Sequence, residues 1–124
     1  MRELIVEDLK HLLPDDLKKA AIPCGRELVL PYTEALDAIA IATVHLIAVL
    51  GLESFEVQRD GLQVVDYSGY DHYIAFTGDW RAFVVANNAQ AERWIKEHRL
   101  GENHGYILTS TSYTEFLALP DRLK

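Results

Sequence analysis

The most constraining feature of the sequence is an uncharged, largely apolar run from Ala38 to Leu52, bounded by Asp37 and Glu53. As a helix, these fifteen residues would span about 22 Å, which is shorter than the roughly 30 Å hydrocarbon core of a bilayer. We therefore predict a buried helix and no membrane span. Thr33 suits the N-cap of this helix and Gly51 suits its C-terminal stop, so the helix is expected to run to about Leu50.

This expected helix is apolar almost all round. One side carries Leu36, Ile39, Ala40, Ile47 and Leu50, and another carries Ile41, Val44 and Ala48. A helix without a polar face must be covered on most sides. Two arrangements satisfy this requirement: a central helix within one protomer, or a homodimer contact through the 36–50 helix. We expect His45 to be a buried, neutral imidazole, and in the dimer arrangement it could instead make assembly pH-sensitive.

The segments before this helix predict two short helices and one extended stretch. Residues 3–13 have near-helical apolar spacing, and Pro14 followed by Asp15 and Asp16 suits the start of a second helix. Residues 22–25 interrupt that helix, and residues 27–30 are expected to be extended until Pro31.

The second half of the chain predicts strands. Apolar and polar residues alternate over residues 54–59, and residues 62–67 are expected to form the returning strand. The pair between them, Asp60-Gly61, is typical of a two-residue hairpin turn. Residues 72–77 and 80–85, joined by Gly78-Asp79, would complete an antiparallel meander. We expect Asn87 and Asn88 to cap a helix to about Arg99, a fifth strand over residues 106–111, and a short last helix that begins with the Ser112–Glu115 capping box.

The expected fold class is α+β. N-terminal helices and a central apolar helix would pack on an antiparallel sheet of about four to five strands, followed by two C-terminal helices. No linker or internal repeat divides the sequence, so we predict a single domain over residues 1–124.

The charge balance excludes several classes of partner. The chain has 12 basic and 19 acidic residues, a formal net charge of −7. Nucleic-acid binding needs many cations against phosphates, and anionic membranes are disfavoured for the same reason. The single cysteine, Cys24, excludes an intrachain disulfide and a cysteine-rich zinc site. With no secretory signal at the N-terminus, the expected location is cytoplasmic.

Aromatic residues are concentrated between positions 67 and 83, where half of the twelve in the chain occur. The binding candidates among them are Tyr67, Tyr70, Tyr73 and Trp80. Aromatic side chains anchor protein partners or stack on planar ligands, but they also pair across strands inside a sheet. Both interpretations stay open from the sequence, and Tyr67 and Tyr70, which flank Ser68-Gly69, are expected to be the most exposed.

The main catalytic candidates are His72, Asp71 and His104. Histidine titrates near neutral pH, and a neighbouring carboxylate can orient it. Adjacent residues on a strand point to opposite faces, so Asp71 could assist His72 only from a bend. No metal-ligand spacing and no nucleotide or hydrolase signature is present, so we predict neither a metal site nor a cofactor.

These observations favour a small acidic cytoplasmic protein-binding module, like an immunity protein, an inhibitor or a small regulator. Its acidic surface would steer association with a basic protein. The alternative is a small enzyme or ligand-binding domain with a His/Asp/Tyr pocket at one end of the sheet. A self-assembling subunit built on the apolar helix is a third hypothesis.

Overall fold

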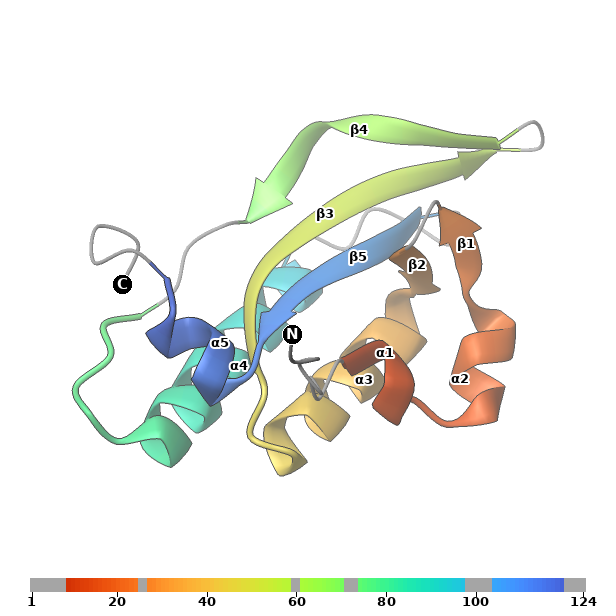
Figure 1. Cartoon of the computed structure of the whole chain (residues 1–124). Helices are drawn as coiled ribbons and strands as arrows, with labels where there is room; N and C mark the ends of the chain where they lie inside the picture. Colours follow the sequence, from red (N-terminus) through yellow and green to blue (C-terminus); the bar gives the residue numbers. More distant parts are fainter. Residues whose placement is uncertain (1–8, 25–26, 59–60, 71–73, 98–103, 120–124) are drawn as a thin grey trace.

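A computed structural model of the chain describes residues 9–24, 27–58, 61–70, 74–97 and 104–119 (Figure 1). The elements in chain order are α1 (Leu9–Leu12), α2 (Asp15–Ala20), β1 (Ile22–Cys24), β2 (Glu27–Pro31), α3 (Tyr32–Val44), β3 (Ala48–Gln58), β4 (Gly61–Tyr70), α4 (Trp80–Glu97), β5 (His104–Thr111) and α5 (Tyr113–Leu117). The predicted α+β class with an antiparallel sheet and C-terminal helices is confirmed.

The sheet has the strand order β1-β2-β5-β3-β4, and every neighbouring pair is antiparallel. The expected hairpin is present as β3 and β4, but the predicted turn at Asp60-Gly61 is wrong in its second residue, because Gly61 is the first residue of β4 and pairs with Gln58. Strand β5 then inserts between β2 and β3, so the sheet is assembled from segments far apart in the sequence.

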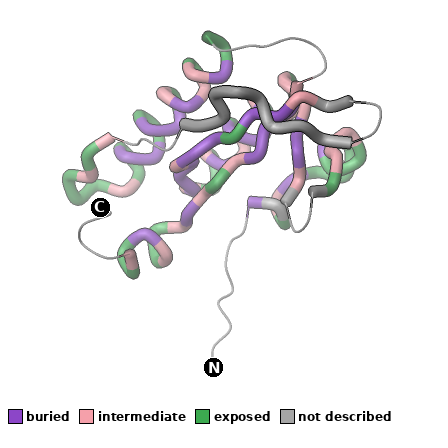
Figure 2. Tube along the Cα trace, turned by 90° about the horizontal axis from the view of Figure 1, so that it is seen from above, coloured by how far each residue is buried: buried purple, intermediate pink, exposed green. Residues whose placement is uncertain are grey.

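The helices α3 and α4 lie together on one side of the sheet, as Figure 1 shows. Between them and the sheet lies the main core, which includes Ala38, Ile39, Leu52, Ile95 and Tyr106. Seen from above, the buried residues follow the central strands and the sides of the helices that face them (Figure 2). The first part of the apolar run thus becomes a helix covered by its own protomer.

The prediction of one helix from Thr33 to Leu50 is wrong in its second part. Helix α3 ends at Val44, and residues 48–50 begin β3. Leu46 has a φ of 57°, and two backbone bonds, from Leu46 to Thr43 and from Ile47 to Ala42, complete a Schellman motif. The chain therefore turns at a left-handed leucine, a residue type that gives little sequence warning of such a turn.

This turn also corrects the expectation for His45. His45 is the exposed C-cap residue of α3, not a buried imidazole. The homodimer hypothesis changes too, because residues 36–50 are not one helix. Ala38 and Ala42 are fully buried inside the protomer, so only the outer side of α3, with Ala40 and Val44, remains exposed.

The predicted strands over 72–77 and 80–85 are wrong within the described residues. Residues 74–77 form no regular structure, and Trp80 begins the long helix α4. Asp79 is responsible, because its side chain accepts a hydrogen bond from the Ala82 N–H (3.1 Å) and its carbonyl accepts one from the Phe83 N–H (3.0 Å). Gly78-Asp79 therefore begins a helix, and there is no four-stranded meander.

Asn87 and Asn88 lie in the middle of α4 and do not cap it, which corrects a further prediction. Both are buried, and both form hydrogen bonds with the backbone between the end of α3 and the first residues of β3. Asn88 accepts from the Val49 N–H (2.9 Å) and donates to the Ile47 carbonyl and to Thr43 Oγ1 (2.9 Å each). Asn87 donates to the Val49 carbonyl (2.8 Å) and accepts from the Ile74 N–H (3.2 Å). The two amides therefore attach α4 to the first residues of β3.

The last helix begins as predicted. Ser112 Oγ accepts from the Glu115 N–H (3.2 Å), and the Glu115 carboxylate accepts from the Ser112 N–H (3.0 Å). This reciprocal capping box fixes a helix of only five residues, which holds the fully buried Phe116 against α4 and the start of β3.

We expect Ser112→Ala to lower the free energy of unfolding by about 1 kcal/mol, because the Glu115 N–H loses its acceptor. Urea denaturation measures the change, and Thr114→Ala, at an exposed position of the same helix, is the matched control. Equal stability of the two variants would show that the cap does not hold α5.

Candidate functional site

Five aromatic rings pack together at one end of the helical layer. They are Phe76, Trp80, Phe83, Tyr113 and Phe116, and they come from the segment before α4, from α4 itself and from α5. Phe76 contacts the other four rings edge-on, at centroid distances of 5.4 to 6.2 Å. Trp80 lies 5.2 Å from Phe83 and 5.0 Å from Tyr113. Each side chain is thus held by several neighbours.

Polar contacts fix the position of this cluster relative to the rest of the fold. Trp80 Nε1 donates to the Leu46 carbonyl (2.7 Å), which ties the start of α4 to the left-handed turn after α3. Asn87 accepts from the Ile74 N–H, two residues before Phe76. The capping box orients Tyr113, the first residue of α5.

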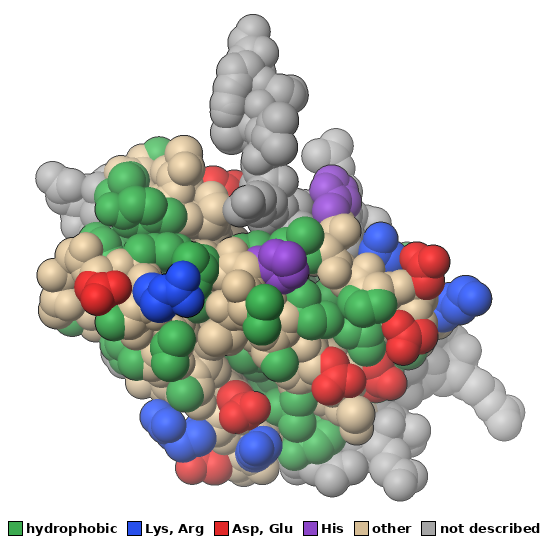
Figure 3. All heavy atoms as spheres, turned by 90° about the horizontal axis from the view of Figure 1, so that it is seen from below, with side chains coloured by type: hydrophobic (Ala, Val, Ile, Leu, Met, Phe, Trp, Pro, Cys, Tyr) green, Lys and Arg blue, Asp and Glu red, His purple; other side chains and the backbone are tan. Residues whose placement is uncertain are grey.

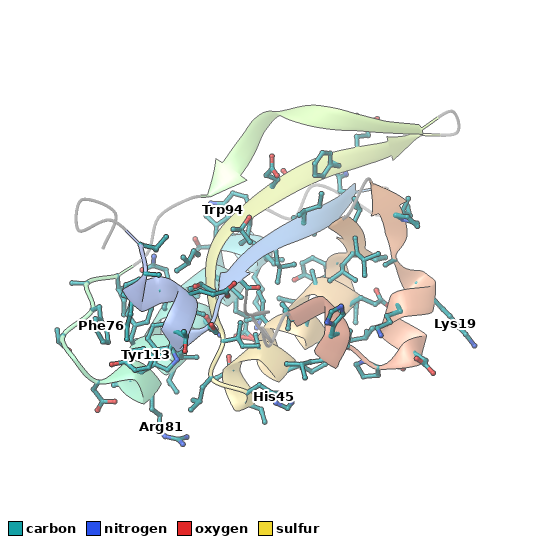
Figure 4. The ribbon with its side chains drawn as sticks, viewed as in Figure 1. Lys19, His45, Phe76, Arg81, Trp94 and Tyr113 are labelled. Atoms are coloured by element: carbon teal, nitrogen blue, oxygen red, sulfur yellow. The ribbon has the colours of Figure 1, made fainter. Side chains whose placement is uncertain are left out.

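Part of this cluster faces solvent. Tyr113 is 41% exposed and Leu117, one turn further along α5, is 47% exposed. Phe76 and Trp80 are partly buried, whereas Phe83 and Phe116 form the buried floor. We call Phe76, Trp80, Tyr113 and Leu117 the aromatic surface. In Figure 4, Phe76 and Tyr113 lie side by side at this end of the molecule, with Arg81 below them.

More exposed apolar side chains lie on the helices near this surface. Val44 is 77% exposed, and Val85 is also exposed. Val44 lies two residues before Leu46, whose carbonyl accepts the hydrogen bond from Trp80. Figure 3 looks onto this helical side, where hydrophobic side chains lie between scattered charged ones. Arg81 is exposed on α4, so the surface combines apolar side chains with a nearby cation.

Of the four predicted binding residues, the structure describes the side chain of Trp80 alone. Trp80 belongs to the aromatic surface. The backbones of Tyr67 and Tyr70 lie in β4, at the edge of the sheet, and their side chains are outside what the structure describes. Tyr73 also lies outside the described residues. Tyr113, which the sequence analysis did not single out, joins Trp80 because a capping box and a tertiary contact bring α5 beside α4.

The predicted catalytic residues are not brought together in the described part of the chain. His72 and Asp71 lie outside it, and His104 is the first residue of β5, directly opposite Glu56 of β3. Across the described ranges, no three His, Cys, Asp or Glu side chains are grouped as metal ligands would be. No helix in these ranges is long and apolar enough to cross a membrane.

Comparisons with known proteins give no information on the family or function of this chain. A scan against protein-family models, a search of curated proteins and a search of solved structures each found no match to this chain.

Proposed function

We propose that this chain is a non-enzymatic protein-binding module that contacts its partner through the aromatic surface. The observation that carries the proposal is the exposure of Tyr113 and Leu117 on top of rings that are packed and hydrogen-bonded in place. Aromatic anchors held by a buried floor lose little conformational entropy on binding, and such residues dominate the energetics of protein interfaces.

The overall charge supports a basic partner. A net charge of −7 accelerates association with positively charged proteins and opposes contact with nucleic acids and anionic membranes. A cytoplasmic location belongs to the same proposal, because a chain with one cysteine does not depend on an intrachain disulfide.

Photo-crosslinking tests the proposal. A benzoylphenylalanine at position 113 keeps an aromatic ring in place, and the same amino acid at the exposed position 11 in α1 is the control. We expect position 113 to capture one protein of defined mass in producing cells, and Leu117→Asp to abolish that adduct. The captured protein, once purified, should bind the Leu117→Asp variant about tenfold or more weakly in calorimetry.

Two outcomes would contradict the proposal. If both positions give the same set of adducts, or none, the aromatic surface is not a docking site. If position 113 captures only a second copy of the chain, the surface is a homodimer contact and the partner is not another protein. Arg93→Asp, an exposed change on α4 away from the aromatic rings, should leave the adduct unchanged.

A further inference from the structure

Four polar side chains lie together on the helix-facing side of the sheet. Ser54 and Glu56 of β3 stand directly opposite Tyr106 and His104 of β5. Leu52, two residues before Ser54, belongs to the main core, whereas Phe55 and Ile107 pack on the other side of the sheet. Alternation along a strand therefore puts all four on the side of the main core. We call Ser54, Glu56, His104 and Tyr106 the polar quartet.

Within the part of the chain that the structure describes, two atoms of the polar quartet are buried and have no hydrogen-bond partner. Ser54 is 0% exposed and its Oγ has none, and the same is true of the buried Nδ1 atom of His104. Buried polar atoms in folded proteins are almost always paired, so an unpaired one needs an explanation, such as a bound water, an ion or a ligand. Ser54 and His104 occupy diagonal positions on neighbouring strands. The backbone positions of such a pair are about 7 Å apart, so two side chains on the same face can both reach one small group that lies between them.

The four side chains of the quartet differ in burial. Ser54 and Tyr106 are buried, whereas Glu56 and His104 are partly exposed. A small molecule would therefore enter between Glu56 and His104 and reach Ser54. Because Ser54 is fully buried, the quartet does not offer a nucleophile to a large substrate, and a hydrolase site is not indicated.

The hydrogen-bond acceptors of the quartet suit a cation that carries several N–H donors. An ionised carboxylate only accepts hydrogen bonds, a serine oxygen accepts readily, and a neutral imidazole accepts at Nδ1 when Nε2 carries the proton. The net charge of −7 also raises the local concentration of cations. A primary ammonium group supplies three N–H donors and one positive charge, which matches these acceptors.

We propose that the polar quartet binds a small primary amine through its ammonium group. Glu56 supplies the negative charge, and Ser54 Oγ and His104 Nδ1 accept from the ammonium N–H groups. This inference does not depend on the aromatic surface, which involves neither β5 nor this part of β3.

Titration of the full chain with methylammonium tests the proposal, with tetramethylammonium at equal ionic strength as the control because it has the charge but no N–H. The readout is the ring resonances of His104 in NMR, assigned with His104→Gln. We expect a saturable shift with methylammonium and none with the control. Glu56→Gln should weaken binding about tenfold or more, and Ser54→Ala about three- to tenfold, since each removes one acceptor of a charged hydrogen bond.

The variants should keep the dispersed NMR spectrum of the folded chain, so that loss of binding is not loss of the fold. Equal shifts with both ions would overturn the proposal, because they report charge screening alone. Absence of any shift, together with a nuclear Overhauser effect between the His104 ring and a long-lived water, would also overturn it and assign the unpaired atoms to an internal water.

Discussion

Asn88→Ala is expected to lower the free energy of unfolding by about 3 to 5 kcal/mol, the largest effect of any side-chain polar group in the described ranges. The substitution removes three hydrogen bonds and leaves the Val49 N–H and the Ile47 carbonyl without their partner in a dry environment. Urea denaturation followed by circular dichroism measures the loss. Arg93→Ala, on the exposed side of the same helix, should change stability by less than about 0.5 kcal/mol.

A matched pair of variants separates the donor from the acceptor in this network. Asn88→Asp keeps the oxygen that accepts from Val49 but replaces the amide donor by an oxygen that faces two acceptors. It should therefore destabilise at least as much as alanine at neutral pH. Thr43→Val removes only one of the three partners and should cost about 1 kcal/mol. Near-native stability of Asn88→Asp would show that the two donor bonds contribute nothing.

Gly105→Ala is expected to cost about 2 to 3 kcal/mol through overpacking. A Cβ at this buried position of β5 would clash with Val29 Cγ1 and would lie 3.3 Å from the Leu30 carbonyl oxygen. Val29 is fully buried and β-branched, so its side chain cannot rotate away at low cost. The same measurement by urea denaturation applies.

A double-mutant cycle identifies the cause. Val29→Ala removes the clashing methyl group, so the two substitutions together should cost at least about 1 kcal/mol less than the sum of the single changes. Gly78→Ala is the control: its φ is 104°, so alanine is strained there, but no atom lies within 4 Å of the added Cβ. Val29→Ala should not compensate for Gly78→Ala, and simple additivity at Gly105 would contradict the predicted clash.

Local signals in the sequence predicted the corresponding structures correctly. The capping box of Ser112 and Glu115 involves residues three apart, and the β3–β4 hairpin joins neighbours in the chain. Their geometry is set by interactions within a few residues, so the pattern alone predicts them.

Sequence patterns that suit two different structures led to the wrong predictions. The run from Ala38 to Leu52 is apolar enough for a buried helix or a buried strand, and periodicity does not distinguish them. The helix ends at Val44 because the Leu46 turn is held by Trp80, 34 residues away, and by the backbone bonds around it. Likewise Asn87-Asn88 resembles a helix cap in sequence, and only the position of Val49 beside α4 makes it an interior pair.

The candidate sites depend even more on long-range contacts. Tyr113 joins Trp80, and Ser54 stands opposite Tyr106, across separations that no local motif encodes. The sequence by itself determined the α+β class, the acidic charge and the local caps and turns, because composition and short-range hydrogen bonding set them. The tertiary structure alone decided where the apolar run divides, which strand lies beside β3 and which polar side chains are buried, because these follow from burial and pairing between distant segments.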